Sequence, residues 1–389
     1  MKKIVFISLL LVFELLWGSG LNAATVTSVT NGNWSSTSTW DCACVPAGND
    51  QVTIAHDVTL NVDILITAGF SLTINSGKSL IGNTSTRRIG FTLSNAGPAI
   101  TITNNGTFTI GIINRENSGG DSNDDYVFDN YGTFNILDNA DCNGSSSSFY
   151  LGRGTFTNYA GGVVNSGPCF YVGGGSNEGI LHNYGEMNFN CGTCSQSFSA
   201  HPRSSMINHP GAIMTATGLF TAGGLNQDNY GCINALGGFR LFEKTSNGGL
   251  GRFTMHDGSK VIVPAGEAFT VQSNTTLDGV DDDGNNANNG CISVGGNVSN
   301  SGTITGEFYL NDADGAVSGT VGPNVTLGTG DCGGGCVAAA PCTVMINSST
   351  PSACNPATNT YSLDVNVSWT MASGTTLTVS VPGGSATLV

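Results

Sequence analysis

Charge is scarce in this chain, and basic charge most of all. Only 10% of the 389 residues are charged, with 12 Lys and Arg against 27 Asp and Glu, a formal net charge of −15. Without a basic surface there is no field to neutralise phosphates, so we expect no nucleic-acid partner. A disordered acidic chain is also excluded, because 39% of the residues are hydrophobic and the mean hydropathy is slightly positive.

Strong helix formers are few, whereas Gly and Asn are abundant, with 56 and 41 residues. Gly costs about 1 kcal/mol at each position inside a helix, and Asn prefers turns. The composition therefore predicts an all-β chain of strands and turns.

Long apolar runs are confined to the N-terminus. An apolar run from Ile4 to Trp17 follows two lysines and precedes small residues that end at Ala24, a pattern typical of a secretory signal peptide over residues 1–24. The run is shorter than the roughly 18–20 apolar residues that span a bilayer. We therefore expect an exported protein, secreted or on the outer cell surface, with no membrane-spanning segment after removal of the signal.

Twelve cysteines follow this segment, and an even number in an exported chain predicts disulfides. Cys191 with Cys194 and Cys332 with Cys336 could also be read as zinc ligands or redox pairs. A zinc ribbon needs a second knuckle at suitable spacing, and a redox pair should open a helix, and neither feature is present. The disulfide candidates are Cys42, Cys44, Cys142, Cys169, Cys191, Cys194, Cys332, Cys336, Cys342 and Cys354.

A turn signature recurs about every 26 residues: an Asn, a Gly shortly after it, and then a large apolar residue. The Asn positions are 104, 130, 158, 183, 208 and 234, and the apolar partners are Phe108, Phe134, Val163, Met187, Ile213 and Phe239. A fixed period indicates a repeat architecture. We expect the Gly to supply a positive φ at the turn and the Asn side chains to hydrogen-bond from coil to coil.

Each repeat holds short alternating runs rich in Thr and aromatic residues, which are typical of strands. Coils of about 26 residues can hold three short strands, and stacked coils pair in parallel. The sequence therefore predicts a right-handed parallel β-helix over residues 63–328. An antiparallel sandwich or a propeller is the alternative. Because Cys142, Cys169 and Cys194 follow their repeat Asn by 11 or 12 residues, we expect Cys169 to bond to Cys142, Cys191 or Cys194.

Residues 31–63 carry a pattern of Trp, Cys and Pro, formed by Gly32, Trp34, Trp40, Cys42, Cys44, Pro46 and Asp50. This stretch resembles the opening module of large, secreted, adhesin-like β-solenoid proteins of the Bacteroidota, which are exported through the type IX pathway. A solenoid end needs a cap over its apolar interior and edge strands. We therefore expect residues 25–62 to form an N-terminal cap, with carbohydrate stacking on the two tryptophans as the alternative.

The pattern of apolar and polar residues changes towards the C-terminus. Residues 329–341 are rich in Gly and Ala and are predicted to be a linker. Beyond them, a run of alternating apolar residues is formed by Tyr361, Leu363, Val365, Val367 and Trp369, and Leu377 begins another such run, as expected of antiparallel strands. An immunoglobulin-like sandwich needs about seven strands, so we expect residues 342–389 to be an incomplete Ig-like module.

Catalytic constellations of β-helix enzymes are not found in the sequence. The histidines have no metal-ligand spacing, and no Gly-x-Ser-x-Gly or phosphate loop is present. The acidic stretch from residue 278 to 286 could supply oxygens to a structural calcium ion through Asp278, Asp281 and Asp283. We expect no other cofactor.

The sequence thus favours an exported, non-enzymatic stalk or adhesin region that binds an extracellular glycan or protein through the solenoid loops. The alternative is a carbohydrate-active β-helix enzyme, either a polysaccharide lyase or a glycoside hydrolase.

Overall fold

The computed structural model of the chain describes residues 23–92, 99–115, 126–137, 149–151, 154–167, 169–173, 179–190, 196–200, 203–242, 251–282, 284, 289–313, 315, 317–328 and 332–336, together with the strands of the C-terminal region. The chain forms two compact units, Met1–Cys336 and Val337–Val389. The predicted signal peptide lies almost entirely outside the described residues.

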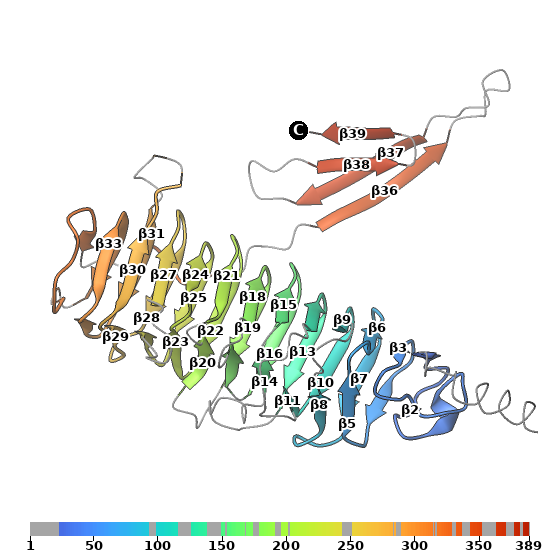
Figure 1. The fold of residues 1–389 in the computed structure, drawn as a ribbon. Helices are drawn as coiled ribbons and strands as arrows, with labels where there is room; N and C mark the ends of the chain where they lie inside the picture. The colour runs from blue at the N-terminus through green and yellow to red at the C-terminus, as the bar shows by residue number, and fades with distance from the viewer. Residues whose placement is uncertain are drawn as a thin grey trace, which may run out of the picture. The chain divides into compact units, whose positions relative to one another are not determined.

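The first unit is a parallel β-solenoid whose successive strands belong in turn to three sheets (Figure 1). Sheet 1 contains β1 (Thr25–Thr27), β3 (Gln51–Ile54), β6 (Ser71–Ile74), β9 (Ile100–Asn104), β12 (Tyr126–Asn130), β15 (Gly154–Asn158), β18 (Gly179–Asn183), β21 (Ser205–Asn208), β24 (Asn226–Asn229), β27 (Gly251–Met255), β30 (Thr275–Gly279) and β33 (Thr303–Gly306).

Sheet 2 contains β2 (Gly32–Asn33), β4 (Val58–Leu60), β7 (Ser79–Gly82), β10 (Thr107–Ile110), β13 (Thr133–Ile136), β16 (Val163–Ser166), β19 (Glu186–Phe189), β22 (Ile213–Ala216), β25 (Cys232–Ala235), β28 (Lys260–Val263), β31 (Gly290–Val294), β34 (Phe308–Asp312) and β35 (Thr326–Gly328).

Sheet 3 contains β5 (Ile64–Thr67), β8 (Arg88–Thr92), β11 (Ile112–Arg115), β14 (Phe149–Leu151), β17 (Phe170–Val172), β20 (Gln196–Ala200), β23 (Leu219–Ala222), β26 (Phe239–Leu241), β29 (Phe269–Val271) and β32 (Val298–Asn300). The predicted solenoid is confirmed, and the alternatives of a sandwich or propeller are wrong for this unit. One 3-10 turn, η1 (Thr37–Thr39), is the only helical element among the described residues.

Coil length varies although the strands stay in register, apart from one shift between Gln196 and Phe198 on β20. Gln51 pairs with Ser71, 20 residues later, and Ser71 pairs with Thr101, 30 residues later. The period of 26 is therefore an average, and the turns take up the difference.

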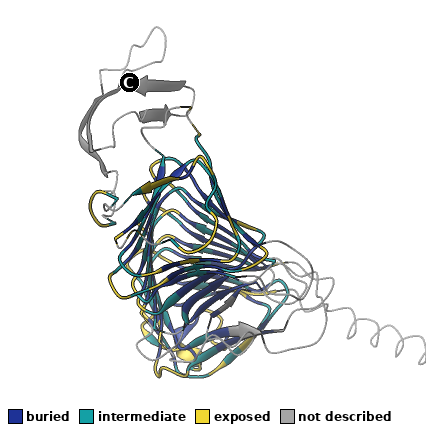
Figure 2. Cartoon of the chain, turned by 90° about the vertical axis from the view of Figure 1, so that its left-hand side faces the viewer, coloured by how far each residue is buried: buried dark blue, intermediate teal, exposed yellow. Residues whose placement is uncertain are grey.

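Apolar side chains fill the interior in columns, and the buried residues lie along the strands of all three sheets (Figure 2). In sheet 3 a column of phenylalanines stacks coil upon coil, with ring centroids 4.2 Å apart for Phe149 and Phe170 and 4.4 Å apart for Phe198 and Phe220. Parallel pairing places identical side chains one strand spacing apart, at which aromatic rings make favourable contact.

The predicted asparagine ladder is present and fully buried at the corner between sheets 1 and 2. Its members are Asn104, Asn130, Asn158, Asn183, Asn208 and Asn229, and each Nδ2 donates to the Oδ1 of the next at 2.7–2.9 Å. The sixth member is Asn229 and not the predicted Asn234, because the coil that follows Asn208 is short. Asn234 instead points outward from sheet 2, where its Nδ2 donates to Thr215.

The apolar row also differs from the prediction at three positions. The interior column of sheet 2 contains Val164, Met214 and Ile233 in register with Phe108, Phe134 and Met187. Val163 and Ile213 lie one position earlier, and Phe239 lies in sheet 3. Turns of unequal length shift the pattern by one or more residues, and a one-residue shift reverses the face of a strand.

The predicted positive φ is present at some of the repeat glycines and absent from others. Gly161 and Gly211 have φ values of 83° and 80°, whereas Gly132 and Gly185 do not have a positive φ. A Cβ atom at Gly132 would overlap the carbonyl oxygen of Gly106, and one at Gly185 would overlap that of Gly162. These glycines therefore permit the close approach of adjacent coils.

A second asparagine column lies on the outer face of sheet 2. Asn135 donates to Thr109 at 3.0 Å, Asn165 donates to Asn135 at 3.0 Å, and Asn188 donates to Asn165 at 3.2 Å. These side chains are partly exposed, unlike those of the buried ladder.

The N-terminal coil ends in an aromatic cap. Trp34 and Trp40 are 1% and 2% exposed, and their rings meet edge to face with centroids 5.0 Å apart. Trp40 Nε1 donates to the carbonyl oxygen of Trp34, and Asp50 accepts hydrogen bonds from the backbone of Ala24 and Ala47. Burial of both tryptophans leaves no ring face for a sugar, which contradicts the carbohydrate-stacking alternative.

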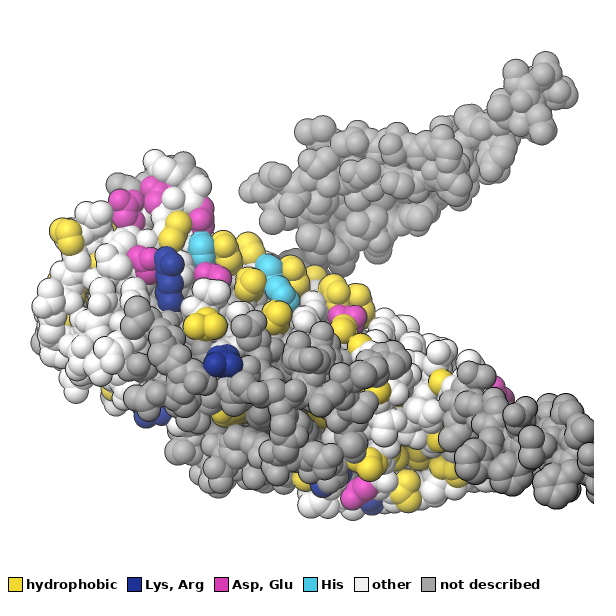
Figure 3. Space-filling view, in the orientation of Figure 1, with side chains coloured by type: hydrophobic (Ala, Val, Ile, Leu, Met, Phe, Trp, Pro, Cys, Tyr) yellow, Lys and Arg dark blue, Asp and Glu magenta, His cyan; other side chains and the backbone are white. Residues whose placement is uncertain are grey.

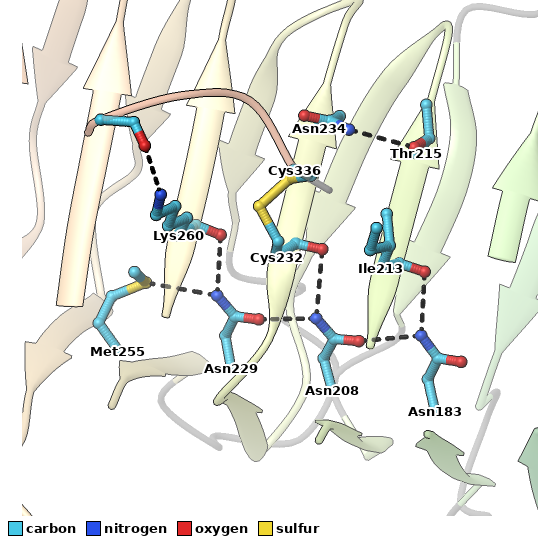
Figure 4. Close-up of a disulfide and its surroundings, with 11 residues drawn as sticks. Asn183, Asn208, Ile213, Thr215, Asn229, Cys232, Asn234, Met255, Lys260 and Cys336 are labelled. Atoms are coloured by element: carbon cyan, nitrogen blue, oxygen red, sulfur yellow. Dashed lines mark hydrogen bonds between the residues drawn. A yellow bond between two sulfur atoms is a disulfide. The ribbon is translucent and has the colours of Figure 1, made fainter. Parts of the chain in front are cut away.

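Two disulfides connect residues 332–336 to sheet 2. Cys332 bonds to Cys291 on β31, and Cys336 bonds to Cys232 on β25. Lys260 Nζ on the intervening β28 donates to the carbonyl oxygen of Gly333 at 2.8 Å (Figure 4). We call residues 332–336 the strap. It occupies part of the predicted linker, and Cys232 and Cys291 were not among the predicted disulfide cysteines.

The other described cysteines are also oxidised. Cys42 bonds to Cys44 in the cap, and both were among the predicted disulfide candidates. Cys169 is buried and disulfide-bonded. Cys142, Cys191 and Cys194 lie outside the described residues, as do Cys342 and Cys354, so the choice of partner for Cys169 stays a prediction.

The second unit contains two antiparallel pairs, β36 (Thr343–Pro351) with β37 (Leu363–Thr370) and β38 (Leu377–Val381) with β39 (Gly384–Leu388). The two strands predicted from alternation, from Tyr361 and from Leu377, correspond to β37 and β38. In neither unit does the described part of the chain contain a helix of the length and apolarity needed to cross a membrane.

Candidate functional site

A row of ring side chains follows the buried asparagine ladder along the corner between sheets 1 and 2. Each ring belongs to the residue directly after the last residue of a sheet 1 strand. Because those strands are in register, the rings repeat once per coil, at about 4.8 Å. We call this row the aromatic ridge; its members are Tyr131, Tyr159, Tyr184, His209, Tyr230 and His256.

The rings stack on one another in three close pairs. Centroids lie 4.1 Å apart for Tyr131 and Tyr159 and 3.6 Å apart for Tyr184 and His209, with the planes within 9° of parallel. Tyr230 stacks on His256 at 3.7 Å. Ring faces are thus largely covered by neighbouring rings. Tyr131 and Tyr184 are exposed members of the row, whereas His256 is buried, with 7% exposure.

A second column of side chains flanks the ridge, at the outward position two residues before each ring, and it is polar except at Ile207. It includes Asp129 on β12, His182 on β18 and Asp228 on β24. Figure 3 shows histidine, acidic and hydrophobic side chains together along this flank of the solenoid. The ridge and this column form one continuous strip.

At the N-terminal end of the strip, Tyr159 hydrogen-bonds to Tyr131 and to the Asp129 carboxylate. The hydrogen bond to Tyr131, burial and the negative charge of Asp129 raise the pKa of Tyr159 to about 12. Burial also raises the pKa of Asp129, although the hydrogen bond from Tyr159 opposes the change. The Tyr159 hydroxyl therefore remains protonated at physiological pH.

In the middle of the strip two histidines form a pair, with His182 Nδ1 and His209 Nε2 3.2 Å apart. Burial lowers the pKa of His182, and burial together with the proximity of His182 lowers the pKa of His209. Both imidazoles are thus neutral at physiological pH, with one ring donating to the other.

At the C-terminal end, His256 lies between two carboxylates. Its Nδ1 is 2.9 Å from Asp282 Oδ2, and its Nε2 is 3.3 Å from Asp228 Oδ1. Burial lowers the pKa of His256, but the two hydrogen bonds and the two negative charges outweigh burial and raise it overall. When it is protonated, the ring donates to both carboxylates and so holds the Asp282 loop against β24.

The residues predicted to bind calcium lie next to this end of the strip. Asp278 forms an ion pair with Arg252 at 2.5 Å, and Asp281 Oδ1 accepts a hydrogen bond from the backbone of Gly284 at 2.6 Å. Asp283 lies outside the described residues. No three His, Cys, Asp or Glu side chains within the described ranges are placed to share a metal ion, and the calcium site stays a prediction.

A pocket of about 250 Å³ lies beside the N-terminal cap, lined mainly by apolar residues such as Trp34, Pro46 and Ile64. Its one carboxylate, Asp63, forms an ion pair with Arg87 at 2.7 Å. The pocket thus has no pair of acidic groups of the kind that glycoside hydrolysis requires.

Sequence reasoning missed the aromatic ridge, although its signal is present in the repeats. The residue after the repeat Asn is Tyr at positions 131, 159, 184 and 230 and His at 209. Each of these residues directly follows a ladder asparagine, and because the ladder asparagines lie one above another, the rings do so as well. Comparison of the chain with protein-family models, curated proteins and solved structures gave no match.

Proposed function

We propose that this chain is an exported, non-enzymatic stalk or adhesin region of a secreted or cell-surface protein, and that its aromatic ridge binds an extracellular glycan. The ridge, a row of ring edges repeated at the coil spacing, is the observation that carries the proposal. The proposal includes removal of residues 1–24, kinship of residues 31–63 with the adhesin-like proteins of the Bacteroidota, and an Ig-like module after the solenoid.

A linear polymer suits the ridge because both present their groups at regular intervals. Tyrosine hydroxyls and carboxylates recur along the strip, and sugar hydroxyls can donate to or accept from both kinds of group. The carboxylates of the strip and the net charge of −15 repel polyanions. We therefore favour a neutral glycan over an acidic one.

Disulfides support an extracellular location. Cys42–Cys44, Cys232–Cys336 and Cys291–Cys332 are all formed, and such bonds persist in oxidising compartments. The absence of a matching chain leaves the location as part of the proposal.

One observation favours the enzyme alternative. Asp228, His256 and Asp282 bring two carboxylates to one imidazole at the surface of the solenoid, and such groups can exchange protons. In the structure both ring nitrogens are engaged by the carboxylates, an arrangement that suits a structural clamp better than a general acid.

Binding can be tested on immobilised neutral polysaccharides, with a panel of acidic polysaccharides and extracellular matrix proteins for comparison. Tyr131→Ala and Tyr184→Ala remove rings that are 45% and 41% exposed. Each variant should weaken binding to the neutral glycan about tenfold, equivalent to about 1.4 kcal/mol. Tyr184→Phe keeps the ring and removes only the hydroxyl, so it separates hydrogen bonding from stacking.

Leu236→Ala is the matched control, since Leu236 is 43% exposed but lies after β25, away from the ridge. Equal losses for Leu236→Ala and Tyr184→Ala, or binding to matrix protein alone, would refute the ridge as a glycan site. Cleavage of any polysaccharide that is abolished by His256→Gln would establish the enzyme instead.

A further inference from the structure

The strap runs backwards along the solenoid. Its first cysteine, Cys332, bonds to β31, its Gly333 accepts a hydrogen bond from Lys260 on β28, and its last cysteine, Cys336, bonds to β25. Cys232, Lys260 and Cys291 occupy the same register position on these three successive strands of sheet 2. The strap therefore runs from β31 past β28 to β25, opposite to the order of these strands along the chain.

The last covalent bond between the solenoid and the chain that follows it is thus made at an internal strand and not at the last coil. The second compact unit begins at Val337, directly after Cys336. Cys336 is bonded to β25, although β28, β31, β34 and β35 of sheet 2 lie beyond it. A path along covalent bonds from Val337 reaches β25 without passing through any of those four strands.

We propose that the Cys232–Cys336 disulfide is a mechanical anchor. It transmits tension from the chain after Val337 to β25, so that the coils from β26 to β35 bear none of this tension. The inference rests on the proposed function as a stalk or adhesin region, because a tethered protein of this kind carries tension between its ligand and its attachment.

The surroundings of Cys232 suit this role. Strand β25 pairs on both sides, with β22 and with β28, so a pull on it is resisted by two ladders of hydrogen bonds. The backbone nitrogen of Cys232 donates to Ala212 at 2.9 Å, and its carbonyl oxygen accepts from Asn208 of the buried ladder at 3.4 Å (Figure 4). A pull on the last coil would be resisted by one neighbouring coil only and would peel strands away one after another.

The two disulfides of the strap therefore differ in role although they resemble each other. Cys291 and Cys332 both lie within the loop of 104 residues that Cys232–Cys336 closes, and their own loop spans 41 residues. Tension that crosses from Cys336 to Cys232 never reaches the inner bond. We expect Cys291–Cys332 to fix the path of the strap and to carry no load.

Single-molecule force spectroscopy on the full chain, held by a handle at each end, tests this difference. In the wild type under oxidising conditions, the residues between Cys232 and Cys336 should add nothing to the final contour length. Reduction of the wild type should add about 350 Å for the 104-residue separation, beyond the length released when the Cys42–Cys44 and Cys169 disulfides open. The variant C232S/C336S should add about 210 Å, because the 41-residue loop stays closed.

The force of the first unfolding event provides the second readout. It should fall in C232S/C336S and stay at the wild-type value in the matched variant C291S/C332S, whose final contour length should also be unchanged. An equal fall in both variants would overturn the proposal, since each bond would then act by general stabilisation. A contour length in C232S/C336S equal to that of the oxidised wild type would overturn it as well.

Failure of this inference is distinguishable from failure of the proposed function. Glycan binding by the aromatic ridge is measured without tension and should be the same in the wild type and C232S/C336S. Retained binding by that variant also shows that it folds, and reduced wild-type protein repeats the pulling test without any substitution.

Discussion

At the scale of single residues, the strip shows how neighbours reverse the acid–base behaviour of one side chain. His182 and His209 are partly buried beside each other and have lowered pKa values, whereas His256 lies between Asp228 and Asp282 and has a raised pKa. A folded-state pKa above the unfolded value of about 6.5 means that the native state binds the proton more tightly than the unfolded chain.

His256 should therefore stabilise the fold fully at pH values below about 6.5 and progressively less as pH rises through its raised folded-state pKa. We expect His256→Gln to lower the free energy of unfolding by about 1–2 kcal/mol at mildly acidic pH, with a smaller loss at alkaline pH. Urea denaturation of both proteins over this pH range measures the difference.

His182→Gln is the control of opposite sign. Because burial lowers the pKa of His182, protonation of the unfolded chain below about pH 6.5 destabilises the wild type, and the variant should gain relative stability there. Parallel pH profiles for the two variants would contradict the assignment of opposite shifts.

At the scale of structural elements, the two asparagine columns contain the same residue in different surroundings. Asn158 in the middle of the buried ladder accepts from Asn130 and donates to Asn183 and to the carbonyl oxygen of Glu186. Asn165, in the middle of the outer column, also bonds to an asparagine on each side but is partly exposed. Water can replace the lost partners only in the outer column.

We therefore expect Asn158→Ala to cost about 2–3 kcal/mol in unfolding free energy, because buried donors and acceptors are left unpaired. Asn165→Ala should cost less than about 1 kcal/mol. The midpoints of chemical denaturation of the two variants give the comparison. Similar costs at both positions would show that the buried ladder contributes no more than a surface column.

The sequence was sufficient for the parts of the fold that depend on a repeated local pattern. Five ladder residues, from Asn104 to Asn208, could be placed because their turns keep a nearly constant phase. Asn229 could not, since the shortened coil puts Asn234 closer to the expected spacing. The partners of Cys332 and Cys336 depend on the path of the strap over sheet 2, which no local pattern encodes. The aromatic ridge was visible in the repeats only once the phase of the ladder was known.

At the scale of the whole molecule, different bonds connect the coils in different regions. The buried ladder joins the coils from Asn104 to Asn229 and ends against Met255 Sδ. The strap begins its attachments at Cys232, only three residues after the last Asn, and extends them to Cys291. A loop of 104 residues stabilises by about 4–5 kcal/mol in the chain-entropy description.

Loss of the Cys232–Cys336 bond should therefore weaken the solenoid unevenly. We expect hydrogen exchange in C232S/C336S under oxidising conditions, where the Cys169 disulfide stays closed, to accelerate most for β26–β35 and to stay slow from β9 to β24. The variant C42S/C44S, which opens a bond between cysteines two residues apart, should leave exchange in both regions unchanged under oxidising conditions. Uniform acceleration across all coils would contradict this division.

The tolerance of the three sheets for coils of 20 or 30 residues has an evolutionary consequence. Register is kept by the strands alone, so a duplicated or deleted coil changes the length of the solenoid by one step of about 4.8 Å and leaves every other coil as it was. Each added coil that ends in Asn and Tyr would also lengthen the ridge by one ring. The length of the solenoid and the number of rings in the ridge can thus change together, because both depend on the number of coils.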